Sequence, residues 1–221
     1  MRFQHISDTH GDIPRMYNNA HAIIHSGDFF PNSIEVRASN YIKEKDFQRQ
    51  WLKDNVESLK QNLRDRAFLF TLGNHDFLSG EETSAILTSN GIENICLHDK
   101  VNYYAGFKFY GFPYIPAING KWNFERTADQ MIVHANDLVE RVNQDPVDFI
   151  VAHSPMHCLD YDSVYHVNFS NAAMANALLY RLNVLPKYYL HGHIHSAHGV
   201  CFKDNILFSN AATVSNVIEV L

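Results

Sequence analysis

The chain has 221 residues, of which 46% are hydrophobic and 19% are charged. This composition is typical of a globular protein, and at roughly 100–200 residues per domain we expect one domain over residues 1–221. A formal net charge of −6 argues against a basic face that binds a long nucleic acid or an anionic membrane. The sequence has neither a run of 18 apolar residues nor an apolar secretory segment, so we expect a cytoplasmic protein without a membrane partner.

The first half of the chain alternates between strand and helix patterns. Residues 2–7 and 22–26 are short apolar runs that predict buried strands. Residues 41–66 predict an amphipathic helix, and we expect the charged residues opposite its apolar stripe to be solvated. The stripe consists of Leu52, Val56, Leu59 and Leu63. The following residues predict a strand at 67–72, a helix at 81–90 and a β-hairpin at 101–111.

The second half of the chain continues the same alternation and then changes to strands. Helices are predicted at residues 126–142 and 171–183, and strands at 148–152 and 187–191. Residues 200–202, 206–209 and 217–221 predict consecutive antiparallel strands near the C-terminus. Alternating strands and helices together with antiparallel segments predict an α/β protein. We expect two mixed β-sheets packed face to face and flanked by helices.

Residues that bind metals or transfer protons follow directly after the five predicted strands. They are Asp8 and His10, Asp28, Asn74 and His75, His153, and His193 and His195. Because ligands at the carboxyl ends of strands in an α/β sheet converge on one crevice, we expect these side chains to meet. The fourteen histidines of the chain agree with this expectation, since imidazole is enriched where metal or proton chemistry occurs.

The spacing of these residues suits two divalent ions better than one. Asp8 and His10 can both reach one ion from an irregular loop, and the two oxygens of Asp28 can bridge two ions. His193 and His195 point to the same side of an extended chain but are too far apart to favour a single ion. This spacing suits ions that are roughly 3.5–4 Å apart.

Asn74 and His153 complete the site of the second ion. Oxygen and imidazole ligands of this kind suit Mn, Fe, Zn or Ni and do not identify which metal is bound. Two divalent ions with two carboxylates and neutral Asn and His ligands leave a net charge of about +2, which attracts a phosphate and lowers the pKa of a bridging water toward ~7. The resulting hydroxide is the expected nucleophile. His75, next to a ligand in sequence, is expected to protonate the leaving alkoxide or to hydrogen-bond the phosphate.

In this order, the residues resemble the calcineurin-like metallophosphoesterase superfamily. Its pattern is D-x-H, G-D, G-N-H-[DE], H and G-H-x-H, and all five blocks occur here in sequence order. The resemblance implies a four-layer fold and a binuclear metal centre, with manganese expected to support activity in vitro. It implies one ion held by Asp8, His10, Asp28 and His195, a second held by Asp28, Asn74, His153 and His193, and His75 as the catalytic histidine.

Residues 106–125, 153–160 and 192–200 also resemble the small metallophosphoesterase-domain-containing (MPPED) group, which is linked to class III cyclic-nucleotide phosphodiesterases. That resemblance implies 2′,3′- or 3′,5′-cyclic nucleotides as candidate substrates. The chain departs from the group at Ser154-Pro155-Met156, where the group favours G-P-P. Residues 27–33 read GDFFPNS and lack the GDxxDRG of the Ser/Thr protein phosphatases.

We therefore expect a phosphodiesterase that hydrolyses a small phosphodiester, with a cyclic nucleotide as candidate substrate. The alternatives are a phosphomonoesterase, a nuclease for short oligonucleotides and a non-catalytic protein-binding scaffold of the same fold. Tyr114, Trp122 and Phe124 could stack a nucleobase or could serve local packing. Asp76 is expected to orient the turn in which it lies. The oligomeric state is left open.

Overall fold

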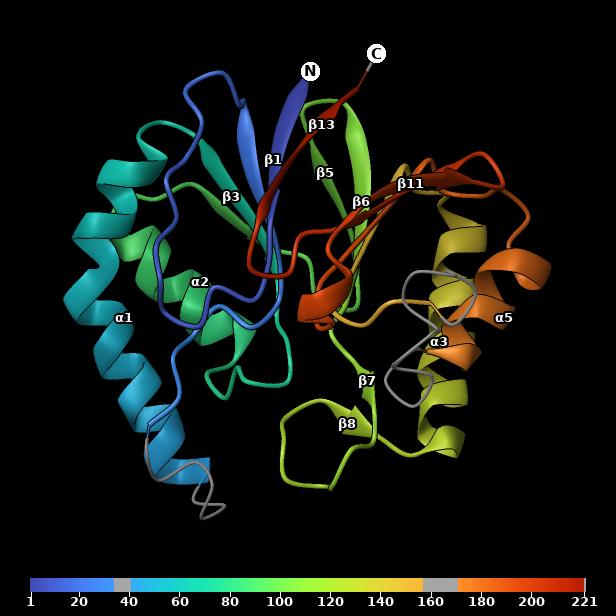
Figure 1. Ribbon diagram of the computed structural model, residues 1–221, viewed down its shortest axis with the longest axis horizontal. Helices are drawn as coiled ribbons and strands as arrows, with labels where there is room; N and C mark the ends of the chain where they lie inside the picture. Colours follow the sequence, from blue (N-terminus) through green and yellow to red (C-terminus); the bar gives the residue numbers. More distant parts are fainter. Residues whose placement is uncertain (34–40, 157–170, 221) are drawn as a thin grey trace.

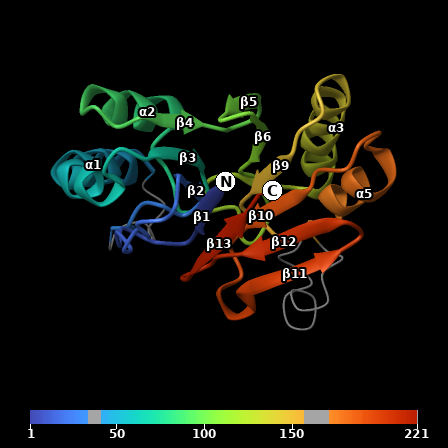
Figure 2. The ribbon, with the colours of Figure 1, turned by 90° about the horizontal axis from the view of Figure 1, so that it is seen from above.

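The computed structural model describes residues 1–33, 41–156 and 171–220. Two large sheets pack face to face, and two helices cover the outer face of each sheet (Figures 1 and 2). This is the four-layer α/β arrangement predicted from the sequence. A helix with the length and apolar character needed to cross a membrane does not occur in the described part of the chain.

The first sheet has the strand order β13-β1-β2-β3-β4. Its strands are β1 (Arg2–Ile6), β2 (Ala22–Ser26), β3 (Ala67–Thr71), β4 (Asn94–Cys96) and β13 (Ser215–Glu219). Strands β1 to β4 are parallel, and β13 runs antiparallel to β1 at the edge. Ile6 lies beside His25 and Ser26 beside Thr71. The first three strands therefore end close to the same level.

The second sheet has the order β11-β12-β10-β9-β6-β5. Its strands are β5 (Val101–Tyr104), β6 (Phe107–Phe112), β9 (Phe149–Ala152), β10 (Tyr188–His191), β11 (Gly199–Lys203) and β12 (Ile206–Asn210). The four inner strands are parallel and both edge strands are antiparallel. A separate pair, β7 (Ile115–Pro116) and β8 (Glu125–Arg126), lies outside the two sheets.

In the described part of the chain, four α-helices form the outer layers. Helices α1 (Tyr41–Leu63) and α2 (Gly80–Ser89) cover the first sheet, and α3 (Ala128–Gln144) and α5 (Ala172–Arg181) cover the second. Alternate side chains of a strand pack against different layers of the fold. Phe68 and Phe70 pack with the helices of the first sheet, whereas Leu69 packs between the sheets. Because strands buried on both faces need apolar residues at every position, they appear in the sequence as uninterrupted apolar runs.

The predicted helices and the five predicted strands are present, with ends that differ by at most three residues. The helix predicted at 126–142 begins at Ala128 because Thr127 caps it, and the Oγ1 atom of Thr127 accepts a hydrogen bond from the N–H of Gln130. Strands β4, β7 and β8 were not predicted, since each has only two or three residues and shows no alternation.

The prediction of three consecutive antiparallel strands near the C-terminus is wrong for the last of them. Strands β11 and β12 form the predicted hairpin, but the chain then crosses to the first sheet, where β13 pairs with β1. The crossing is held by a bridge between Ala212 and Ser7 and by the N–H of Ala211, which donates to His191 O. Pairing with β1 places Ile218 opposite Phe3, where both side chains pack between the sheets.

Candidate metal centre

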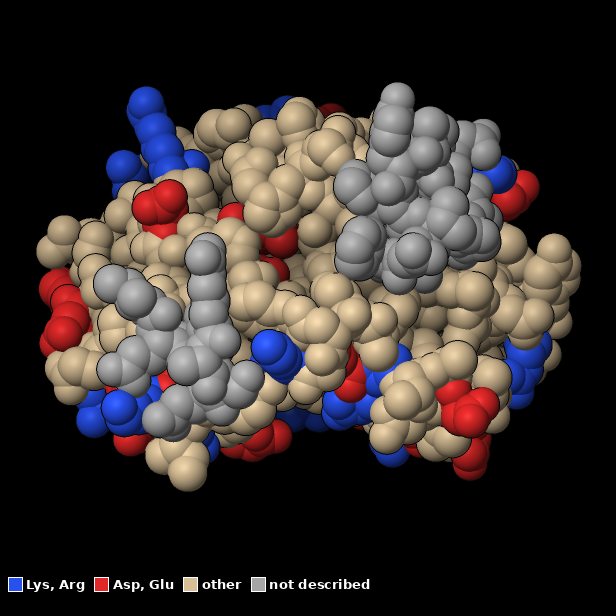
Figure 3. Space-filling view, turned by 60° about the horizontal axis from the view of Figure 1, so that its bottom comes forward, with Lys and Arg blue, Asp and Glu red and all other residues tan. Residues whose placement is uncertain are grey.

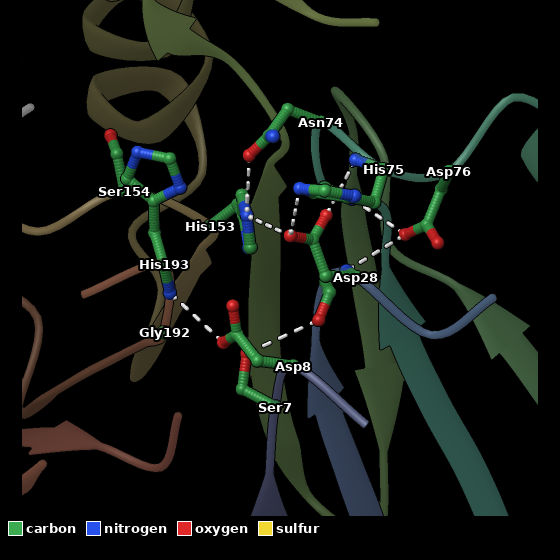
Figure 4. Close-up of polar contacts among 12 residues, drawn as sticks. Ser7, Asp8, Asp28, Asn74, His75, Asp76, His153, Ser154, Gly192 and His193 are labelled. Atoms are coloured by element: carbon green, nitrogen blue, oxygen red, sulfur yellow. Dashed lines mark hydrogen bonds and ion pairs between the residues drawn. The ribbon is translucent and has the colours of Figure 1, made fainter. Parts of the chain in front are cut away.

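The parallel strands of both sheets end at one side of the molecule, and the eight predicted site residues lie there. Asp8 and His10 follow β1, Asp28 follows β2, Asn74 and His75 follow β3, His153 follows β9, and His193 and His195 follow β10. Figure 4 shows six of them pointing toward one another. In Figure 3 this side is hollowed near its middle, where carboxylate atoms (red) are visible inside.

Asp8 joins the two sheets within this site. It is 3% exposed. Its Oδ2 atom accepts a hydrogen bond of 2.9 Å from the backbone N–H of His193, and its Oδ1 atom lies 3.1 Å from Nε2 of His195. Burial raises the pKa of Asp8, but the hydrogen bond with His195 and the charge of His153 outweigh burial, so the net pKa is lowered. Asp8 is therefore a carboxylate at neutral pH.

Asp28 is the second buried carboxylate. Its Oδ2 atom lies 3.3 Å from Nε2 of His153 and 4.0 Å from Nε2 of His75, and its Oδ1 atom accepts a 2.7 Å hydrogen bond from the N–H of His75. Burial raises the pKa of Asp28, but the charges of His153 and His75 lower it well below its usual range. One carboxylate thus contacts imidazoles from both sheets.

The ring of His153 is oriented by two hydrogen bonds. Its Nδ1 atom donates to the carbonyl oxygen of Ser26 at 2.9 Å, so Nε2 faces Asp28 and the Oδ1 atom of Asn74, which is 3.0 Å away. Burial lowers the pKa of His153, but the charge of Asp28 outweighs burial and raises the pKa to about 9. A cation bound among these oxygens must displace the proton on Nε2, so metal binding should release protons.

The donor atoms form three overlapping groups, within each of which they lie no more than 4.8 Å apart. The groups are Asp8–His10–His195, His10–Asp28–His75 and Asp8–Asp28–His153. Because His10 and both carboxylates recur, the groups make one continuous site. The ring of His193 lies 5.1 Å from that of His153, and burial lowers the pKa of His193 to about 3. Its imidazole is therefore neutral, the form that binds metals.

This donor set fits two divalent ions. Carboxylate, amide and imidazole donors without thiolates suit Mn, Fe, Zn or Ni. Asp28, which contacts imidazoles of both sheets, would be placed to be shared by a pair of ions.

Four of the predicted ligands have a backbone conformation that L-residues rarely adopt. The φ angle is 52° at Asp8, 46° at His10, 58° at Asp28 and 70° at His193. Such conformations cost about 1–3 kcal/mol each and persist only where the surroundings hold them. Here the N–H of Asp8 donates to Gly27 O and that of His10 donates to Asp28 O. The loops are therefore fixed by their own hydrogen bonds.

Two glycines give the carboxylates the space they occupy. A Cβ atom at Gly192 would collide with Oδ2 of Asp8, and one at Gly73 would collide with Oδ1 of Asp28. The glycines that accompany the ligands in the sequence motifs are therefore required by the close approach of backbone and carboxylate.

His75 is held by Asn32, a residue that the sequence analysis missed. The Nδ1 atom of His75 hydrogen-bonds to Oδ1 of Asn32. The Nδ2 atom of Asn32 faces two acceptors, Oε1 of Glu44 and the carbonyl oxygen of His75, both at 3.1 Å. The amide oxygen must therefore face the ring, so Nδ1 carries the hydrogen and Nε2 is directed toward Asp28.

Helix α1 supplies two further buried polar residues that the sequence analysis did not identify. Glu44 accepts hydrogen bonds from Asn32 and Ser33. Gln48 donates to His75 O at 2.7 Å and accepts from the N–H of Phe77 at 2.7 Å. The expectation of a solvated face concerned the charged residues opposite the apolar stripe, and these two residues lie on the buried face instead. A signal was available, because 44 and 48 continue the apolar stripe in steps of four toward the N-terminus.

Asp76 joins the loops that follow β2 and β3. Its Oδ2 atom accepts from the N–H of Gly73 (2.7 Å) and of Asp28 (2.9 Å), and its Oδ1 atom accepts from the N–H of Phe30 (2.9 Å). Burial, together with the charge of Asp28, raises the pKa of Asp76 to about 7. The predicted role in orienting the turn agrees with these contacts.

Of the three aromatic residues considered for base stacking, two pack against each other in the core and one lies at the site. Tyr114 is 6% exposed and stacks on His134, with ring centroids 3.7 Å apart. Phe124 packs against the core. Trp122 alone lies beside the site, where its ring centroid is 4.1 Å from that of His75.

Comparison with known proteins agrees with this architecture. The chain is 29% identical over 235 residues to a UPF0046 protein of Caenorhabditis elegans, covering 96% of this chain and 75% of that protein. The fold is similar to that of a Thermus thermophilus protein, TT1561, with a TM-score of 0.60, 13% identity and coverage of 96% and 88%. A second solved structure matches with a TM-score of 0.68, 10% identity and coverage of 96% and 90%.

The narrower resemblance to the MPPED group stays a prediction.

A family model, calcineurin-like phosphoesterase, matches residues 1–197 and so includes all eight site residues. The chain therefore belongs to the calcineurin-like phosphoesterase family.

Proposed function

We propose that the chain is a metal-dependent phosphodiesterase acting on a small phosphodiester, with a cyclic nucleotide as the candidate substrate. The observation that carries this proposal is the convergence of two buried carboxylates, Asp8 and Asp28, with imidazoles from both sheets. Membership of the phosphoesterase family supplies the reaction class, hydrolysis of a phosphoric ester.

The proposed ligand sets are those that the family resemblance implies, and the donor group Asp8–His10–His195 falls within the first of them. Asp8, His10, Asp28 and His195 would hold one ion, and Asp28, Asn74, His153 and His193 would hold the other. When bound, two divalent ions neutralise charge on the phosphate and lower the pKa of a water to near neutrality.

His75 has the geometry of a proton donor to the leaving group. Its Nδ1 atom is engaged with Asn32, and its Nε2 atom is directed toward Asp28 and hence toward the place of the phosphate. A protonated Nε2 can donate to the ester oxygen as the bond to phosphorus breaks. The bond to Asn32 keeps the ring from rotating away.

A groove beside His75, lined in part by Trp122, offers room for an organic group of the substrate and is compatible with a diester. A diester carries a second organic group on phosphorus, and that group needs a place next to the metal centre. A phosphomonoester has only one organic group to accommodate.

The proposal is tested by comparing hydrolysis of bis-p-nitrophenyl phosphate and p-nitrophenyl phosphate by metal-stripped protein reconstituted with Mn²⁺. We expect metal-dependent activity that is higher on the diester. Preference for the monoester would make the protein a phosphomonoesterase with the same metal centre. If the metal-loaded protein hydrolyses neither substrate, hydrolysis of simple esters is contradicted. The alternative of a non-catalytic protein-binding scaffold is then favoured.

Asp28→Ala is the variant that tests the bridging role. Because Asp28 contacts imidazoles of both sheets, we expect loss of at least one ion, measured by elemental analysis, and a fall in rate of more than about 100-fold, since loss of an outer partner alone costs 10–100-fold. Unchanged metal content would contradict the assignment.

A further inference from the structure

A groove of about 460 Å³ lies next to the candidate metal centre, within the range of small-ligand pockets. It is lined by Tyr41, Ile42, Lys45, Phe77, Gly120, Trp122 and Asn123. These residues come from three places in the chain: the start of α1, the loop after His75, and the loop between β7 and β8.

The groove adjoins the centre at one pair of rings. Trp122 lines the groove and also packs against His75, with centroids 4.1 Å apart and an interplanar angle of 35°. The Nε2 atom of His75 is in turn 4.0 Å from Oδ2 of Asp28. A ligand whose phosphate lies at Asp28 can therefore extend past His75 into the groove.

Three residues of the groove, Tyr41, Phe77 and Trp122, are aromatic, and two of them stack on each other. Tyr41 lies on Phe77 with ring centroids 5.2 Å apart and an interplanar angle of 24°. Tyr41 is 40% exposed and its neighbour Ile42 is 79% exposed. Exposed apolar side chains gathered at one place often mark a binding surface. The Nζ atom of Lys45, 3.1 Å from Oε2 of Glu82, adds a hydrogen-bond donor at the rim.

The walls of the groove are fixed to the same backbone that holds the site. The N–H of Asn123 donates to Asn74 O at 3.1 Å, and its Nδ2 atom donates to Asp76 O at 2.6 Å. The N–H of Phe77 donates to Oε1 of Gln48. The position of the aromatic rings relative to the metal centre is therefore set before a ligand arrives, which reduces the entropy that binding must overcome.

We propose that this groove binds the nucleobase of a nucleotide whose phosphate lies at the metal centre. The inference rests on the proposed function for the placement of the phosphate. A base is planar, has a π-face that stacks on Trp and Tyr, and carries ring acceptors that a lysine can reach. A flexible acyl chain would bury apolar surface against these rings but has no π-face to stack on them.

Binding of non-hydrolysed ligands to the Mn²⁺-loaded protein tests this inference without using activity. Adenosine 5′-monophosphate and ribose 5-phosphate differ only in the base, and their Kd values are measured by titration calorimetry. We expect the nucleotide to bind about tenfold or more tightly, because base stacking on an aromatic side chain contributes at this level. Equal Kd values would overturn the subsite.

Tyr41→Ala provides the residue test, since Tyr41 is exposed and lies away from His75, whereas Trp122→Ala also removes a contact of His75. We expect Tyr41→Ala to weaken nucleotide binding several-fold and to leave the binding of ribose 5-phosphate unchanged. Tyr180→Ala is the matched control, because Tyr180 is a 79% exposed tyrosine on α5, outside the groove. Equal weakening of both ligands would contradict base recognition.

Two further arms separate the alternatives. The first uses octyl phosphate. If it binds as tightly as the nucleotide and loses affinity in Tyr41→Ala, the proposal of base recognition is overturned and the groove is a general apolar one. Failure of both ribose ligands to bind the metal-loaded protein would contradict the phosphate site itself, and with it the proposed function. Equal binding of the two ribose ligands would contradict the subsite alone.

Discussion

At the scale of single residues, the orientation of His75 depends on a neutral partner. Asn32 fixes the ring through its amide oxygen, and Glu44 holds the amide. A carboxylate in the place of Asn32 would favour the protonated imidazole electrostatically, whereas an amide only selects the tautomer and the direction of the ring. Asn32 is thus a positioning residue, and its contribution should be measurable separately from that of the metal ligands.

The leaving group of the substrate distinguishes this role from a structural one. Expulsion of p-nitrophenolate needs little help from an acid, but expulsion of an alkoxide does. Hydrolysis of a diester with an alkyl leaving group should therefore fall about 100-fold or more in His75→Ala and about tenfold in Asn32→Ala. Hydrolysis of bis-p-nitrophenyl phosphate should change much less, with metal content unaltered. Equal losses on both substrates would contradict the role.

Sequence alone predicted the eight residues that meet at the site but not those that orient them. Asp8 and His153 could be predicted because metal-binding residue types follow apolar strands, and parallel strand ends converge. Asn32 lies in a loop where an amide has many uses, so its residue type carries no signal. Its partner Glu44 is 12 residues away along the chain, and their hydrogen bond depends on where α1 packs.

At the scale of elements, α1 does more than cover a sheet. Its buried face begins with Glu44 and Gln48 and continues into Leu52 and Val56, so one stripe changes from polar to apolar along the helix. The polar end reaches the loops of the site, and the apolar end reaches the core of the first sheet. Packing of the helix and placement of His75 are therefore coupled.

Gln48→Leu tests this coupling. The substitution preserves the apolar stripe but leaves the N–H groups of Phe77 and Leu78 without their side-chain acceptor. Since each such loss costs about 1–3 kcal/mol, we expect the free energy of unfolding in urea to fall by about 2–4 kcal/mol. Gln50→Leu is the matched control on the exposed face and should change stability by less than about 0.5 kcal/mol. Similar losses in both variants would show that the effect belongs to the helix surface.

The sequence of a strand can show that it is a strand without showing which strand it pairs with. Continuous apolar runs identified β2 and β3, because strands buried on both faces have no polar side. The partner of β13 could not be read in this way. Its position beside β1 depends on the crossing at residues 211–214, where contacts with Ser7 and His191 carry the chain from one sheet to the other.

At the scale of the molecule, buried histidines below the site make stability depend on pH. Burial, with smaller contributions from His191 and His25, lowers the pKa of His5 well below 6.5, and burial lowers that of His25 to about 3. Both imidazoles are neutral in the folded protein. As the pH falls, they bind protons in the unfolded chain before they do so in the folded protein. The stability that depends on their being neutral is complete above about pH 6.5 and is lost as the pH falls toward the pKa of the folded state. The free energy of unfolding then falls by about 1.4 kcal/mol per pH unit for each histidine.

His5→Gln should reduce that slope. The Nδ1 and Nε2 atoms of His5 hydrogen-bond to Oγ of Ser209 and Oγ of Ser26, contacts that an amide can also make, but an amide does not titrate. Between about pH 6 and pH 4.5, urea unfolding of the metal-free variant should lose stability less steeply than the parent, by about 1 kcal/mol per pH unit. An unchanged slope would show that His5 is not protonated on unfolding in this range.

The division of the ligands between the two sheets has a consequence for the order of assembly. Asp8, Asp28 and Asn74 belong to the first sheet, and His153, His193 and His195 belong to the second, so neither proposed ligand set exists until the layers have docked. The last strand, β13, returns to β1 and completes the first sheet with residues from the far end of the chain. On this assignment, a complete ligand set for either ion would therefore require both sheets to be in place.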